Sequence, residues 1–147
     1  RASAFALLDA GVETLFIANR TFERAVALAD ALGEPNHVSA IDASDLSDAK
    51  NVDMIFDATS AGHDGAVPAL PAHVVTAKTI CYHLSYGKAA RHFIAWARAA
   101  GATQTFDGLG MLVEQAAEAF AIWNGVRPET AMVFDQLRTG LADGATE

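Results

Sequence analysis

Residues 14–33, TLFIANRTFERAVALADALG, join a short apolar run to a segment in which apolar residues recur at helical spacing. The run from Thr14 to Ala18 is typical of a β-strand buried on both faces, and it ends at the polar residues Asn19-Arg20-Thr21. The spacing from Phe22 to Leu32 predicts a helix, which Gly33 would close. A buried strand that leads directly into a helix is the repeating unit of a parallel sheet covered by helices.

The same alternation of strands and helices continues on both sides of this stretch. We expect further strands at residues 37–41, 53–58, 79–82 and 103–106, and further helices at residues 2–10, 89–100 and 109–123, with a short one within 42–50. Pro128 is expected in the first turn of a last helix that runs through Leu137. The pattern predicts one α/β domain over residues 1–147, a Rossmann-like doubly wound parallel sheet.

Composition limits the classes of partner. The 147 residues include 10 Lys and Arg against 18 Asp and Glu, a net charge of −8, and 52% of the residues are hydrophobic. One core is expected at this length. The acidic balance argues against nucleic acid or an anionic membrane as partner, but it leaves a small phosphorylated ligand open. Apolar runs are too short for a membrane span or a signal peptide, and the single cysteine, Cys81, suits a reducing cytoplasm.

Ligands of doubly wound sheets bind outside the carboxyl ends of the strands, and Asn19-Arg20-Thr21 follows one such end. A fold that prefers NAD usually has Asp or Glu there, which binds the ribose 2′-hydroxyl, whereas a nearby arginine accommodates a 2′-phosphate. Arg24 would lie in the first turn of the next helix, so that its guanidinium and that of Arg20 can converge on one phosphate. The alternative is that both are solvated surface charges with ion pairs of their own. At this place in the fold we favour the phosphate.

Several other residues, at strand ends and on the helices, have two interpretations each. Gly108 and Gly110 flank a strand-to-helix junction, which permits close approach of a ligand or is an ordinary tight turn. Gln115, farther along that helix, is a helix–helix hydrogen bonder or a ligand contact, and spacing alone favours the first. Tyr86 can offer its hydroxyl to a substrate or pack half-buried. Trp96 and Trp123 are expected in the core or at an interface.

The residues do not support several other chemistries. The sequence has no Gly-x-Ser-x-Gly elbow for a hydrolase, and its histidines and lone cysteine lack the spacing of a metal site. No basic patch interleaved with aromatic residues indicates a nucleic-acid module. We therefore expect no metal and no nucleic acid.

Four segments together resemble the shikimate dehydrogenase family. They are Asn19-Arg20-Thr21 with Arg24, DATSAGHDG at 57–65, YHLSYGKAARHFIAW at 82–96, and DGLGMLVEQAAEAFAIWNGVRPE at 107–129. The resemblance implies the NADP-binding half of a two-domain enzyme that reduces 3-dehydroshikimate to shikimate with NADPH. It also implies that the first strand, its Gly-rich loop and an N-terminal domain with the catalytic residues precede Arg1, so no catalytic residue is expected in this chain. That first strand would be central, and its absence should leave backbone unpaired.

The resemblance also implies roles for individual residues, which fall into three groups. Asn19, Arg20, Thr21 and Arg24 would hold the adenosine 2′-phosphate; Thr59, Ser60, Leu84 and Gly108 would lie along the rest of the cofactor, the last two at its nicotinamide end; and Tyr86 and Gln115 would reach the shikimate or 3-dehydroshikimate.

The chain departs from the family pattern at a few positions. Asp57 replaces the usual Asn, His83 the usual Asp, and Arg91-His92 the usual Thr-Pro. The last two changes are expected to border the active-site cleft. A quinate-using paralogue and a non-catalytic nucleotide-binding module therefore stay open as alternatives.

Overall fold

The computed structural model describes residues 1–42, 46, 52–59 and 70–143. The chain divides into two compact units, residues 1–50 with 69–74 and residues 51–68 with 75–147. The expected short helix within 42–50 and the candidate residue Ser60 lie outside the described residues, apart from Asp42 and Leu46. Each unit has its own parallel sheet.

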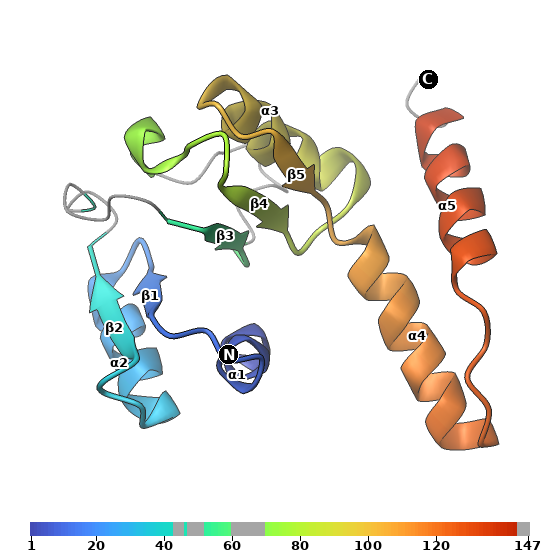
Figure 1. Cartoon of the computed structure of the whole chain (residues 1–147), viewed down its shortest axis with the longest axis horizontal. Helices are drawn as coiled ribbons and strands as arrows, with labels where there is room; N and C mark the ends of the chain where they lie inside the picture. The colour runs from blue at the N-terminus through green and yellow to red at the C-terminus, as the bar shows by residue number, and fades with distance from the viewer. Residues whose placement is uncertain (43–45, 47–51, 60–69, 144–147) are drawn as a thin grey trace. The chain divides into compact units, whose positions relative to one another are not determined.

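The first unit is built around two paired strands (Figure 1, blue to cyan). Its elements are α1 (Ala2–Asp9), β1 (Leu15–Ala18), α2 (Phe22–Leu32), β2 (Val38–Ile41) and the 3₁₀ turn η3 (Ala72–Val74). β1 pairs with β2 in parallel, from Leu15 opposite Val38 to Ala18 opposite Ile41. α2 lies against both strands and buries Ala25 and Leu32, and Gly33 ends it in the left-handed conformation, with φ of 72°.

The second unit holds a three-stranded parallel sheet in the order β3-β4-β5. Its elements are β3 (Met54–Asp57), β4 (Ile80–His83), η4 (Gly87–Ala90), α3 (Arg91–Ala99), β5 (Gln104–Phe106), α4 (Leu109–Asn124) and α5 (Ala131–Asp143). Figure 1 shows α4 and α5 as a helical hairpin that follows β5. All strands point the same way, so their carboxyl ends share one edge of the sheet.

The two faces of this sheet differ in what they carry. Cys81 and His83, which are two residues apart on β4, lie on the face of the sheet that α3 covers. There the ring of Phe93 packs 5.4 Å from the ring of His83. The opposite face carries a row of rings from three strands, Phe56, Tyr82 and Phe106, with centroids 5.4 and 6.4 Å apart. The core of this unit therefore lies between the sheet and α3.

Parallel strands with covering helices confirm the predicted α/β class, but the sheet is in two parts. Among the described residues, β1 and β3 each pair along one edge only. Two helix boundaries were wrong: residues 87–90 form a 3₁₀ turn before α3, and α5 begins at Ala131 rather than around Pro128. The connection at 125–130 is fixed instead by Arg127, whose guanidinium binds Glu114 and Glu118 on α4.

Trp123 was expected in the core or at an interface, and the structure excludes the first of these. Its side chain is 80% exposed at the end of α4, so it does not belong to the core of the described residues. Trp96 is half-buried, and its ring lies 5.7 Å from that of Phe93.

Candidate functional site

The turn from β1 to α2 presents the residues expected to hold a phosphate. Asn19 shapes this turn, because its Oδ1 accepts the Thr21 N–H at 2.9 Å. Thr21 occupies the position before the first turn of α2, and its side chain makes no capping hydrogen bond. The first amides of α2 therefore lack a side-chain acceptor and favour an anion.

Both arginines of this turn are exposed and available. Arg20 precedes α2, and Arg24 lies in its first turn, with its amide bonded to the carbonyl of Thr21 at 3.0 Å. In the part of the chain that the structure describes, no acidic group lies within ion-pair distance of either guanidinium, although Glu23 occupies the same turn. The alternative interpretation, in which both arginines are surface charges held in ion pairs, therefore lacks an acidic partner among these residues.

The carboxyl edge of the second unit joins three turns. The Leu84 amide donates to the Asp57 carbonyl at 3.0 Å, which links the turn after β4 to the end of β3. The Gly108 amide donates to the Ser85 carbonyl at 2.9 Å, which links the turn after β5 to the same place. Thr59, whose amide donates to Asp57 Oδ1 at 2.9 Å, follows directly on β3. The candidate residues Thr59, Leu84 and Gly108 thus come from turns that are hydrogen-bonded in series.

Gly108 is required by the protein itself. A Cβ at this position would lie 1.9 Å from the Leu84 carbonyl oxygen, a distance that no side chain can adopt. The glycine therefore allows the turn after β5 to approach the turn after β4. Its expected role, close approach of a ligand, is not needed to explain the residue.

The two residues expected to reach a substrate are both exposed. Tyr86 is 43% exposed and lies just before η4. Gln115 is exposed on α4. Neither side chain has a hydrogen-bond partner among the described residues, so the helix–helix bond favoured for Gln115 is absent there.

The departures from the family pattern divide into buried and exposed residues. Asp57 and His83 are 4% and 0% exposed, so the expectation that His83 borders a cleft is wrong. The His83 side chain lies in the core because it shares a strand face with Cys81. Arg91 and His92, in contrast, are exposed at the start of α3.

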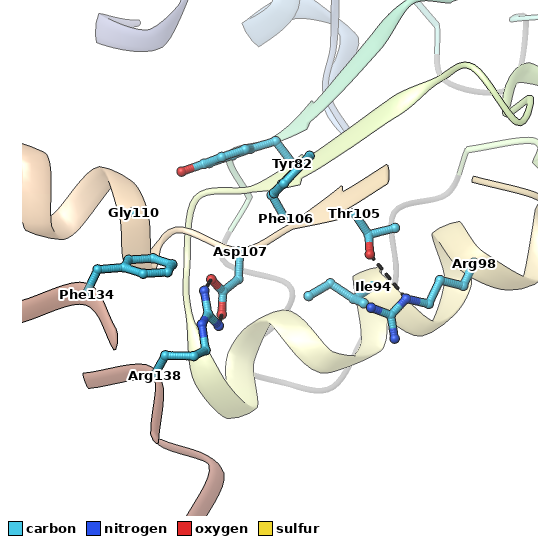
Figure 2. Close-up of a pocket in the computed structure, with 9 residues that line it drawn as sticks. All are labelled: Tyr82, Ile94, Arg98, Thr105, Phe106, Asp107, Gly110, Phe134 and Arg138. Carbon is cyan, nitrogen blue, oxygen red and sulfur yellow. Dashed lines mark hydrogen bonds and ion pairs between the residues drawn. The ribbon is translucent and has the colours of Figure 1, made fainter. Parts of the chain in front are cut away.

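Asp107 is a buried carboxylate that organises the turn after β5. Its oxygens accept bidentate hydrogen bonds from Arg138 at 2.7 and 2.8 Å, and also the amides of Leu109 at 3.3 Å and Gly87 at 3.5 Å. Burial by itself raises the pKa of Asp107, but these hydrogen bonds and the positive charge of Arg138 outweigh it and hold the pKa below its ordinary value. Figure 2 shows Arg138 reaching from α5 to this carboxylate, beside a cavity of about 250 Å³.

Sequence reasoning missed the role of Arg138. The signal was present, because Arg138 is the only basic residue after Arg127, and a carboxylate at the end of a buried strand needs a partner. Its guanidinium also lies 5.1 Å from the centre of the Phe134 ring. The hydrogen bonds between Arg138 and Asp107 tie α5 to the candidate site.

Two classes of feature were not found in the described ranges. No helix there has the length and apolar character to cross a membrane. No group of three His, Cys, Asp or Glu side chains there is arranged to hold a metal ion.

Comparison with known proteins gives consistent matches over the chain. The family model described as shikimate / quinate 5-dehydrogenase matches residues 1–66, and the one described as shikimate 5'-dehydrogenase C-terminal domain matches residues 108–133. A shikimate dehydrogenase (NADP(+)) of Stenotrophomonas maltophilia is 50% identical over 97% of this chain and 51% of its own length. The chain thus spans about half the length of the curated relatives it matches.

Solved structures agree with these matches. An Ael1 enzyme from Pseudomonas putida has a TM-score of 0.82 at 40% identity, over 92% of this chain and 49% of that one. Shikimate 5-dehydrogenase from Thermus thermophilus, solved with NADP(H) and shikimate, has a TM-score of 0.72 at 31% identity, over 94% of this chain and 50% of that one.

Proposed function

Because the chain belongs to the shikimate and quinate dehydrogenase family, we propose that it is the dinucleotide-binding half of an NADP-dependent shikimate dehydrogenase. The whole enzyme would transfer hydride between NADPH and 3-dehydroshikimate to give shikimate. The observation that carries the proposal is the arginine couple at the carboxyl end of β1, Arg20 and Arg24, which has no acidic partner in the described part of the chain.

The turn after β1 would recognise the 2′-phosphate. Asn19 replaces the carboxylate that an NAD-preferring fold uses at this position, so it would not repel the phosphate. Arg20 and Arg24 would each donate charge-assisted hydrogen bonds to it, and the N-terminus of α2, which has no side-chain cap, would add to them. Thr21 would contribute through its backbone, since its side chain makes no cap there.

The turns of the second unit would hold the rest of the cofactor and one side of the substrate. Thr59 and Ser60 would lie beside the cofactor, Leu84 and Gly108 at its nicotinamide end, and Tyr86 and Gln115 at the substrate. Bound NADPH supplies the hydride, and these residues would bind and orient. The groups that move the proton would belong to the upstream half of the polypeptide, so no catalytic residue is assigned to this chain.

The same upstream half would complete the fold. We place both units in a single nucleotide-binding domain and expect the upstream sequence to supply a further strand, for which β1 and β3 each offer an edge that no described residue pairs with. The cytoplasm is the compartment that we propose, because Cys81 is buried as a free thiol.

A quinate dehydrogenase is a second candidate function. The observation that favours it is the pair Arg91-His92, which is exposed at the start of α3 and departs from the family pattern at a position that the resemblance puts beside the active-site cleft. The matching family model includes quinate enzymes as well. A third interpretation, a nucleotide-binding module without catalysis, would follow if no substrate is turned over.

Steady-state kinetics of the full-length protein separates the three. The values of kcat/KM for shikimate and quinate are measured with NADP⁺ and with NAD⁺. We expect shikimate with NADP⁺ to give the highest value. Higher values with quinate would favour the second candidate, and no turnover with any of the four pairs would leave only the binding module.

A further inference from the structure

Asp57 and His83 form a buried polar pair at the ends of two neighbouring strands. They are direct register partners, the last residues of β3 and β4, and they are 4% and 0% exposed. His83 Nε2 lies 3.4 Å from Asp57 Oδ2. Two residues back along the same strands, the register partners are the buried apolar residues Ile55 and Cys81. The polar pair therefore interrupts an apolar face at the carboxyl edge of the sheet, where the turns after β3 and β4 begin.

Each of the two side chains holds the backbone amide two residues farther on. Asp57 Oδ1 accepts the Thr59 N–H at 2.9 Å, and His83 Nδ1 accepts the Ser85 N–H at 2.9 Å. Since Nδ1 is an acceptor, the proton of the neutral ring is on Nε2, which faces the carboxylate of Asp57. The pair thus spans the turns after β3 and after β4 through one contact.

This geometry excludes a direct catalytic role for His83. Both ring nitrogens are directed at protein groups, and the ring is held against Phe93. The contact of Nε2 with Asp57 is longer than an ordinary N–H···O hydrogen bond, so Nε2 has no hydrogen-bond partner among the described residues. The Asp57 carboxylate is nevertheless the group that Nε2–H faces, so the attraction between them links the two turns although it is not an ordinary hydrogen bond.

We propose that Asp57 and His83 are positioning residues that hold the turns at 57–59 and 83–85 in one relative placement, and that they thereby set the affinity for the nicotinamide half of the cofactor. The inference rests on the proposed function, because it takes Leu84 to lie at the nicotinamide end and Thr59 to lie beside the cofactor. The phosphate-binding turn after β1 belongs to the other unit, so its own hydrogen bonds do not depend on the pair. The pair should therefore affect one end of the dinucleotide and leave the other unchanged.

The test uses the full-length protein and two probes, NADPH and adenosine 2′,5′-bisphosphate, which carries the 2′-phosphate but no nicotinamide. Asp57→Asn keeps the acceptor for the Thr59 amide but turns an N–H donor toward the Nε2–H of His83. The double variant Asp57→Asn with His83→Asp restores a donor opposite an acceptor, with the polarity reversed. The matched control is Cys81→Ala, a buried change on the same face of β4 that touches neither turn.

We expect Asp57→Asn to raise the Kd of NADPH about tenfold and to leave the Kd of adenosine 2′,5′-bisphosphate within about twofold of wild type. The double variant should recover the NADPH affinity to within about threefold. Cys81→Ala should lower the unfolding temperature without changing either Kd.

Three results would overturn the role of the pair: equal weakening of both probes by Asp57→Asn, no weakening at all, or a double variant no better than the single one. Wild-type protein that fails to bind adenosine 2′,5′-bisphosphate would instead overturn the proposed function, and this result is seen before any variant is made.

Discussion

Replacing Arg138 with methionine removes the guanidinium that contacts Asp107 and keeps most of the length of the side chain. Hydrogen bonds to a charged group are worth about 1.5–3 kcal/mol each, and breaking a fully buried ion pair costs about 3–5 kcal/mol. Two features lower that figure here: the Arg138 side chain is 46% exposed, and the amides of Leu109 and Gly87 remain on the carboxylate. We therefore expect a loss of about 1–2 kcal/mol in the free energy of unfolding at neutral pH.

The matched control is Arg127→Met, because Arg127 also pairs with carboxylates on the helical hairpin. Its partners Glu114 and Glu118 are 54% and 62% exposed, against 6% for Asp107. That exposure limits the expected loss for Arg127→Met to less than about 1 kcal/mol. Urea titration of the full-length protein, followed by circular dichroism, measures both variants under the same conditions.

The pH dependence has a definite sign. Asp107 has a lowered pKa in the folded protein, so its contribution to stability is complete above the pKa of the unfolded chain, about 3.9, and is lost as the pH falls through the folded value. The difference between wild type and Arg138→Met should stay constant from about pH 5 to 8 and shrink below about pH 4. An equal loss for Arg127→Met and Arg138→Met, or a difference that persists in acid, would show that the ion pair between Arg138 and Asp107 does not supply this stability.

Three further outcomes are expected. Gly108→Ala should destabilise the protein by about 3 kcal/mol or more, because its Cβ meets the Leu84 carbonyl at 1.9 Å, whereas Gly110→Ala, whose Cβ would lie 3.8 Å from Phe134, should be neutral or stabilising in a thermal melt. Burial raises the pKa of the Cys81 thiol, so a thiol reagent near pH 8 should label it only after unfolding, and rapid labelling of folded protein would contradict this. The 147-residue chain alone should show no turnover with NADP⁺ and shikimate, and activity in that assay would place catalytic groups in this chain.

The positions of the strands and helices were predictable because their local patterns are strong. An apolar run such as Leu15–Ala18 is too short for a helix, and the polar residues that follow it mark the carboxyl end of a strand. The expectation that this strand is buried on both faces was wrong, because half-buried and exposed residues alternate along it and Phe16 is 48% exposed. The boundaries that were wrong depend on contacts distant in sequence. α5 begins at Ala131 rather than at Pro128, and the connection before it is held by Arg127, which binds back to α4; local spacing carries no trace of that contact.

The site was predictable in its residue types and less so in its connections. The charge of Arg20 and Arg24 at a strand end is a local signal, whereas the pairing of Asp107 with Arg138 joins residues 31 apart. The burial of His83 follows a rule that was available, because residues two apart on a strand share a face and Cys81 is apolar.

Arg20 and Arg24 are proposed to bind the 2′-phosphate of NADP(H). The measurement that tests this role compares the dissociation constants of NADPH and NADH for the full-length protein, wild type and Arg20→Asp, with Lys78→Asp as a control of equal charge change at an exposed site. We predict that wild type and the Lys78 variant bind NADPH at least about tenfold more tightly than NADH, and that Arg20→Asp loses this preference by weakening NADPH alone. Equal affinity of the wild-type protein for both cofactors, or an equal loss for both in Arg20→Asp, would show that these arginines do not recognise the 2′-phosphate.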